Sequence, residues 1–194
     1  VISDGKEALL EHFLDAPALM ETLHRRQKHD QIAKIHEVEL SESVLKSVKQ
    51  NEPLGLGHAV WCAKELVGDE PFAVILADDT VLGDKSCLAQ MMESYNKTGG
   101  NVIASCEVPL EETSKYGVFK LADRDGNLFS VSGLVEKPHP SVAPSNMTIF
   151  GRYILQPEIF AYLDKHEKGA GGEIQLTDAM AKLINDQAFY GYVF

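Results

Sequence analysis

Cysteine is scarce in this chain of 194 residues, and its three cysteines lie far apart. Cys62 falls in an apolar helical pattern and Cys106 in a strand pattern, while Cys87 has no cysteine nearby, so we expect buried free thiols rather than metal ligands. This usage fits a reducing compartment, and we expect the cytoplasm. No apolar run approaches the roughly 18 residues of a membrane span, and no signal peptide pattern is present, so no membrane partner is expected.

Basic residues are in the minority, since 18 lysines and arginines stand against 29 aspartates and glutamates, for a formal net charge of −11. A general nucleic-acid-binding protein needs a basic surface, so we expect no nucleic-acid partner. Phosphate ligands remain compatible, because a few placed lysines, backbone N–H groups or a divalent metal can hold them. The seven histidines form no zinc-binding pattern, and no G-x-S-x-G segment occurs.

The first half of the chain alternates between helical and strand patterns. Helical periodicity covers 7–14, 18–28, 56–66 and 85–97, strand patterns cover 44–49, 72–77 and 101–108, and the polar segment 30–43 is expected to be a helix tail followed by a loop. The run 72–77 is continuously apolar, which is typical of a strand covered on both faces. The alternation predicts an α/β fold with an open, mostly parallel sheet flanked by helices.

The second half has a different pattern. Strands are expected at 116–121, 128–136, 147–155 and 190–194, and helices at 156–164 and 175–185, the last of them capped by Thr177 or a neighbour. The length of the chain fits one domain.

A glycine-rich turn, G-L-G-H-A-V, begins at Gly55 and opens a helix. It is not a dinucleotide-binding fingerprint, because Val60 stands at the third glycine position, and it lacks the Gly-Lys-Ser/Thr of a P-loop. Taken alone, it favours a structural turn. Gln50 lies five residues earlier, and its amide can both donate to and accept from a pyrimidine edge, so a base-binding loop becomes the favoured interpretation.

Asp78 and Asp79 follow the buried strand. Asp78, the nearer to the strand, is a candidate ligand for Mg²⁺, which proteins hold with one or two carboxylates plus substrate phosphates, and Asp79 is expected to cap the turn. The alternative is a solvated turn with no ligand role.

Glu136 and Lys137 end another strand, before Pro138. If strand geometry continues, their side chains point to opposite faces, so that the carboxylate can bind sugar hydroxyls and the ammonium a phosphate. The alternative is a surface ion pair. Asp78 and Lys137 are expected to face one common cavity.

Several motifs together resemble one family, the bacterial UTP–glucose-1-phosphate uridylyltransferases. They are V-I-S-D-G-K, Q-N-E-P-L-G-L-G-H-A-V, G-D-E-P-F-A-V-I-L-A-D-D, S-K-Y-G-V, V-S-G-L-V-E-K-P, A-P-S-N-M-T-I-F-G-R-Y-I-L and G-G-E-I-Q-L-T-D-A, and they cover nearly the whole chain apart from 30–43. The resemblance implies a Rossmann-like nucleotidyltransferase fold. It also implies a Mg²⁺-dependent transfer of the uridylyl group from UTP to glucose 1-phosphate, which gives UDP-glucose and pyrophosphate.

The same resemblance implies roles for individual residues and for the two halves of the chain. Residues 1–110 would bind the nucleotide and 111–194 the sugar. The implied residues are Gln50 and Gly55 for uracil, Asp78 for the metal, Gly117, Glu136 and Gly151 for the sugar, and Lys137, acting with Asp78 in catalysis, for the sugar-linked phosphate. Glu173 and Asp178 would support the pocket.

The chain departs from the family pattern at both ends. It lacks the G-x-G-T-R loop, the P-K lysine and the second metal-binding aspartate of the family, so we expect a fragment that is inactive alone. Transfer from dTTP or another nucleotide to another sugar phosphate, and non-catalytic binding of a sugar nucleotide, are alternatives, and a NAD-binding domain is a weaker one. We also expect a homo-oligomer, without a fixed number of subunits.

Overall fold

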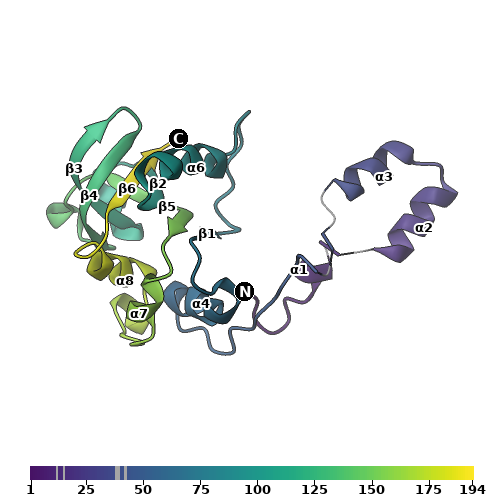
Figure 1. Cartoon of the computed structure of the whole chain (residues 1–194), viewed down its shortest axis with the longest axis horizontal. Coiled ribbons are helices and arrows are strands. Elements are labelled where there is room, and N and C mark those ends of the chain that lie inside the picture. The colour runs from purple at the N-terminus through teal and green to yellow at the C-terminus, as the bar shows by residue number, and fades with distance from the viewer. Residues whose placement is uncertain (12, 15, 38–39, 42) are drawn as a thin grey trace. The chain divides into compact units, whose positions relative to one another are not determined.

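The computed structural model describes residues 1–11, 13–14, 16–37, 40–41 and 43–194 (Figure 1). They form two compact units, Val1–Pro53 and Leu54–Phe194. The expected helix at 7–14 and the expected helix tail and loop at 30–43 include positions 12, 38, 39 and 42, which lie outside the described residues. None of the helices in these ranges is long and apolar enough to cross a membrane.

The described residues of the first unit form three short helices, α1 (Ala8–Glu11), α2 (Pro17–Arg25) and α3 (His29–His36). The helical part expected at the start of 30–43 is present as α3, although it forms a separate helix that begins at His29 and whose buried residue is Ile32. The strand expected at 44–49 is wrong. This segment makes one isolated parallel bridge, between Ile2 and Lys49. The stretch around Ile2 is too short to pair with it as a strand.

The second unit is built on one sheet of six described strands, in the order β1-β5-β2-β6-β4-β3. The strands are β1 (Phe72–Ile75), β2 (Asn101–Glu107), β3 (Gly117–Asp125), β4 (Leu128–Glu136), β5 (Met147–Leu155) and β6 (Phe189–Val193). The sheet is mixed, but the expectation that it is mostly parallel is wrong, because β2–β6 is the single parallel pairing among these strands. The reason is β5, which lies between β1 and β2 and pairs antiparallel with both.

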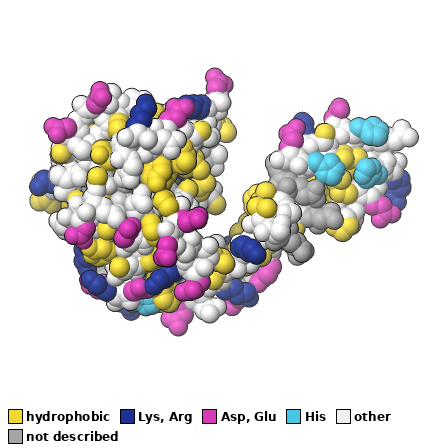
Figure 2. Space-filling model, viewed as in Figure 1, with side chains coloured by type: hydrophobic (Ala, Val, Ile, Leu, Met, Phe, Trp, Pro, Cys, Tyr) yellow, Lys and Arg dark blue, Asp and Glu magenta, His cyan; other side chains and the backbone are white. Residues whose placement is uncertain are grey.

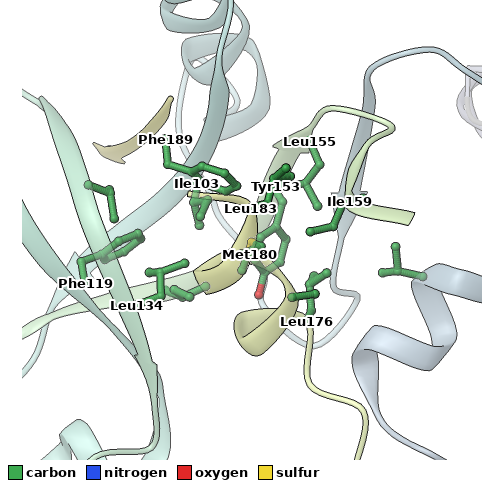
Figure 3. Packing of buried hydrophobic residues seen from close by; sticks show 14 of the residues in the cluster. Ile103, Phe119, Leu134, Tyr153, Leu155, Ile159, Leu176, Met180, Leu183 and Phe189 are labelled. Atoms are coloured by element: carbon green, nitrogen blue, oxygen red, sulfur yellow. The ribbon is translucent and has the colours of Figure 1, made fainter. Parts of the chain in front are cut away.

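Helices cover both faces of this sheet, which confirms the α/β class (Figure 1). On one face, Cys87 and Met91 of α6 (Cys87–Thr98) pack against Val102 and Ile154. The larger core lies on the other face, where side chains of α7 (Ile159–Leu163) and α8 (Leu176–Leu183) meet those of the strands (Figure 3). Val60 of α4 (Leu56–Cys62) joins this core. The remaining elements are α5 (Lys64–Val67) and the 3₁₀ helices η1 (Leu110–Lys115), η2 (Pro140–Val142) and η3 (Ala170–Gly172).

β1 is less covered than its apolar sequence indicates. Its residues alternate between partly buried and exposed, and Ile75 is 54% exposed. The expectation of burial on both faces is therefore wrong. β1 lies at the edge of the sheet, and α6 packs on β2 and β5 instead.

Candidate active site

The start of β3 and the end of β4 bring two predicted sugar-binding residues together, because Gly117 is paired with Glu136. A Cβ atom added to Gly117 would lie 2.7 Å from Ile149 Cδ1, 3.1 Å from Thr177 Oγ1 and 3.3 Å from Glu136 Oε2. Glycine at this position therefore keeps a space open beside the Glu136 carboxylate. Thr177, expected as a candidate helix cap, is instead buried against this space, and Gln175 is the N-cap of α8.

The third predicted sugar-binding residue, Gly151, lies in the middle of β5 beneath an acidic side chain. A Cβ atom on Gly151 would overlap the carboxylate of Asp79, so Asp79 packs on Gly151 rather than only capping its turn. Tyr153 lies two residues further along β5, on the same face. Burial and the nearby charges of Glu136 and Asp79 raise the pKa of the Tyr153 hydroxyl. Ile149, Gly151 and Tyr153 share one face of β5, and because Glu136 lies with Ile149 around Gly117 while Asp79 lies on Gly151, the ends of β1 and β4 border one region of the sheet.

Lys137 leaves the strand geometry that its sequence predicts. Its φ is +46°, in the left-handed region, and its backbone N–H donates to the carbonyl of Tyr116 at 3.0 Å. Its ammonium lies 3.5 Å from Glu136 Oε1. Strand geometry, on which the expectation of opposite faces depended, therefore ends before Lys137, because the positive φ breaks the alternation. The Lys137 side chain is 47% exposed and that of Glu136 11%, so a sheltered carboxylate lies beside an ammonium open to solvent.

Asp78 is exposed in the turn that follows β1. The Arg152 guanidinium holds this turn by donating to the carbonyl of Leu76 at 2.8 Å and to the carbonyl of Asp79. No group of three His, Cys, Asp or Glu side chains able to hold a metal occurs among the described residues. A single exposed carboxylate still fits Mg²⁺, because this ion usually keeps several waters and takes further oxygens from substrate phosphates.

The glycine-rich turn packs tightly against another part of the second unit. Ile174 donates its backbone N–H to the Leu54 carbonyl at 2.7 Å, and its own carbonyl accepts from the Gly57 N–H at 2.8 Å. A Cβ atom would lie 2.9 Å from the Ile174 oxygen if added to Gly55 and 2.7 Å if added to Gly57. The φ of Gly55 is +107°, which few other residues adopt. The structural role of both glycines is thus clear, and the nucleotide role of Gly55 stays a prediction.

Two other predictions are not tested by the structure. Gln50 belongs to the first unit and Gly55 to the second, so their partnership stays a prediction. A cavity of about 330 Å³ lies between α7 and α8, with Gln175, Asp178 and Lys182 in its wall. Asp78 and Lys137 do not line this cavity, and a cavity shared by those two residues also stays a prediction.

Sequence reasoning missed Tyr153 and Arg152. Both fall inside an apolar strand pattern, where a tyrosine is normally a core residue, and only the charge of Arg152 in such a run could have drawn attention. Asp178, expected to support the pocket, is half-buried in the first turn of α8. Burial and the charge of Glu136 raise the pKa of the Asp178 carboxyl.

Comparison with known proteins decides the family. The model of the nucleotidyl transferase family matches residues 7–194. A UTP–glucose-1-phosphate uridylyltransferase of Komagataeibacter xylinus is 45% identical over 192 residues, which are 99% of this chain and 68% of the relative. The chain belongs to the nucleotidyl transferase family. Within it, the chain groups with the UTP–glucose-1-phosphate uridylyltransferases, as its motifs predict.

Solved structures agree with this assignment. A UDP-glucose pyrophosphorylase complexed with UDP-glucose is 35% identical, with a TM-score of 0.86 over 100% of this chain and 71% of its own. A UTP-bound UGPase from Acinetobacter baumannii is also 35% identical, with a TM-score of 0.84 over 99% of this chain and 67% of its own. The predicted nucleotidyltransferase fold is thus confirmed, and this chain spans about two thirds of the length of its relatives.

Proposed function

We propose that the full-length protein, meaning this chain with the remaining length of its relatives, transfers the uridylyl group of UTP to glucose 1-phosphate. The products are UDP-glucose and pyrophosphate. The observation that carries the proposal is the convergence of Gly117, Glu136 and Gly151 on one face of the sheet, with the Lys137 ammonium beside Glu136. The 45% identity to a relative of that name supports the same reaction.

The chemistry of these groups suits two anionic reactants. In our proposal, Glu136 accepts hydrogen bonds from sugar hydroxyls in the space that Gly117 and Gly151 leave open. Lys137 binds the phosphate of the sugar and aligns its oxygen with the α-phosphorus of UTP. Phosphoryl transfer depends mainly on such positioning and charge neutralisation, and a phosphate monoester is already an anion at neutral pH, so we assign no general base.

The nucleotide side of the proposal rests on fewer contacts. Gln50 and Gly55 are assigned to uracil, and residues 1–110 and 111–194 to the nucleotide and sugar halves. Asp78 would hold Mg²⁺, which neutralises phosphate charge when bound. The three free cysteines support a cytoplasmic location. Scattered basic side chains on the face of the second unit shown in Figure 2 support small-molecule substrates rather than nucleic acid. A homo-oligomer remains our expectation.

Pyrophosphate release tests the proposal. The full-length protein should release pyrophosphate from UTP and glucose 1-phosphate far faster than from dTTP or GTP. Lys137→Met should lower kcat/KM on the order of 10²–10³-fold, the usual loss when one group that stabilises transition-state charge is removed. Lys97→Met, at an exposed position in α6, is the control and should leave the rate unchanged. A protein that binds UDP-glucose but releases no pyrophosphate would favour the non-catalytic alternative.

A further inference from the structure

The predicted uracil-binding loop depends on a short segment, Glu173–Gln175, that lies far from it in sequence. Ile174 exchanges two backbone hydrogen bonds with this loop, through Leu54 and Gly57, and a Cβ atom on Gly55 would lie 2.8 Å from Glu173 Cβ. There is no spare space between the two segments. Any shift of Glu173 or Ile174 therefore moves Gly55.

The segment Glu173–Gln175 has little regular structure to hold it. It follows Gly171 and Gly172, both with positive φ, and it precedes α8. Besides the Gly169 N–H, which donates to the Glu173 carbonyl at 2.8 Å, the Gln175 side chain supports the segment, because its Nε2 donates to the Ala170 carbonyl at 3.0 Å and to Glu173 Oε2 at 3.1 Å. Gln175 is only 7% exposed, so these bonds form with little competition from water.

The same turn of the chain also reaches the sugar side, through a different residue. Thr177 lies against Gly117, as described above, whereas the two hydrogen bonds of the Gln175 amide both go to the preceding loop. Removing that amide should thus disturb the nucleotide loop and leave the space around Gly117 unchanged.

We propose that Gln175 is a positioning residue for the nucleotide. Its amide fixes Glu173 and Ile174 against Gly55 and so sets the position of the uracil-binding loop. This inference rests on the function proposed above, in which Gly55 binds uracil.

The test is Gln175→Met in the full-length protein, which removes the amide while keeping the length of the side chain and adding no charge. The KM for UTP should rise about tenfold, which corresponds to about 1.4 kcal/mol and matches the net contribution of one or two hydrogen bonds. The KM for glucose 1-phosphate should stay within about twofold, because the space around Gly117 is unchanged. A rise in the KM for UTP alone separates a local effect from general destabilisation. Backbone amide exchange at Gly57 and Ile174 should also become faster.

Gln187→Met is the matched control, since the Gln187 amide accepts from Asn101 at 3.0 Å, at the start of β2. It should change neither KM. Glu173→Ala, at an exposed position, removes one acceptor of the Gln175 amide and should give the same split at smaller size, so it decides the question if Gln175→Met does not fold. Equal rises in both KM values, or no change in either, would overturn the inference. A wild-type protein without UTP turnover would instead overturn the proposed function.

Discussion

Replacing Gly57 with alanine should destabilise the second unit, although alanine is the better helix former. Gly57 is the second residue of α4, and its φ is not positive, so no backbone strain opposes the change. The obstacle is steric. The new Cβ atom would lie 2.7 Å from the Ile174 oxygen, 3.0 Å from the Gln175 carbonyl carbon and 3.1 Å from Leu163 Cδ2. Two of these atoms belong to the backbone and cannot rotate away.

The sizes of the opposing effects decide the sign. Alanine gains at most about 1 kcal/mol over glycine inside a helix, and less in the first turn. Overpacking typically costs about 1–3 kcal/mol. Separating the two segments also weakens the bond from the Gly57 N–H to the Ile174 carbonyl, which contributes about 1 kcal/mol. We therefore expect a net loss of about 1–3 kcal/mol in the free energy of unfolding, since the two costs exceed the gain.

Urea unfolding followed by tryptophan fluorescence measures this loss, because Trp61 is the single tryptophan of the chain and lies in α4. Gly83→Ala is the matched control. Its nearest atom would be the Lys85 carbonyl oxygen at 3.7 Å, so its stability should change by less than about 0.5 kcal/mol. If Gly57→Ala were as stable as Gly83→Ala, the turn at 54–57 would not be packed against Ile174, and the inference about Gln175 would lose its basis.

Three further predictions concern the sugar side of the site and two carboxyl groups of the second unit. Gly151→Ala should lower kcat/KM for glucose 1-phosphate on the order of 10- to 100-fold, because its Cβ atom displaces Asp79, and unchanged steady-state kinetics would contradict the packing of Asp79 on Gly151. Asp178→Asn should raise the Tm at pH 7, because a carboxyl whose pKa is raised in the folded state destabilises that state once it ionises. The gain in Tm should vanish below about pH 4, where the carboxyl is protonated in both the folded and the unfolded state. Asp164→Asn should lower the Tm at pH 7, since hydrogen bonds from Lys64 and Trp61 lower the pKa of Asp164. If the Tm of the Asp178 and Asp164 variants changed in the same way with pH, both assignments would be refuted.

Local sequence patterns predicted the strands well where pairing is simple. The expected strand at 147–155 and the expected strand at 128–136 coincide with β5 and β4. The order of the strands could not be predicted in this way, because nothing in the sequence of β5 shows that it lies between β1 and β2. That placement arises from pairings between residues about 30 to 80 positions apart, such as Phe72 with Leu155. The antiparallel character of the sheet was missed for the same reason.

The candidate site was partly predictable, and the missing part is also non-local. Gly55, Gly117 and Gly151 each stood out as glycines in motifs, but the atoms that require glycine there come from Ile174, Thr177 and Asp79. Each of these partners lies in a part of the chain distant in sequence from its glycine. The sequence thus indicates where a side chain must be absent, and only the fold shows which neighbour requires its absence.

Lys137 has a positive φ but does not lie at the end of a helix, where such residues are common. Three described residues other than glycine have positive φ, namely Gln27, Lys137 and His166. Gln27 and His166 follow helices α2 and α7, and their N–H groups satisfy helical carbonyls, as is common at helix ends. Lys137 follows a strand, where a left-handed residue costs on the order of 1–2 kcal/mol. Its ammonium lies beside Glu136 in this conformation, whereas an extended one would direct it to the opposite face. Strain of this kind clusters at functional sites, so the backbone at Lys137 marks this residue as a functional-site candidate independently of any motif.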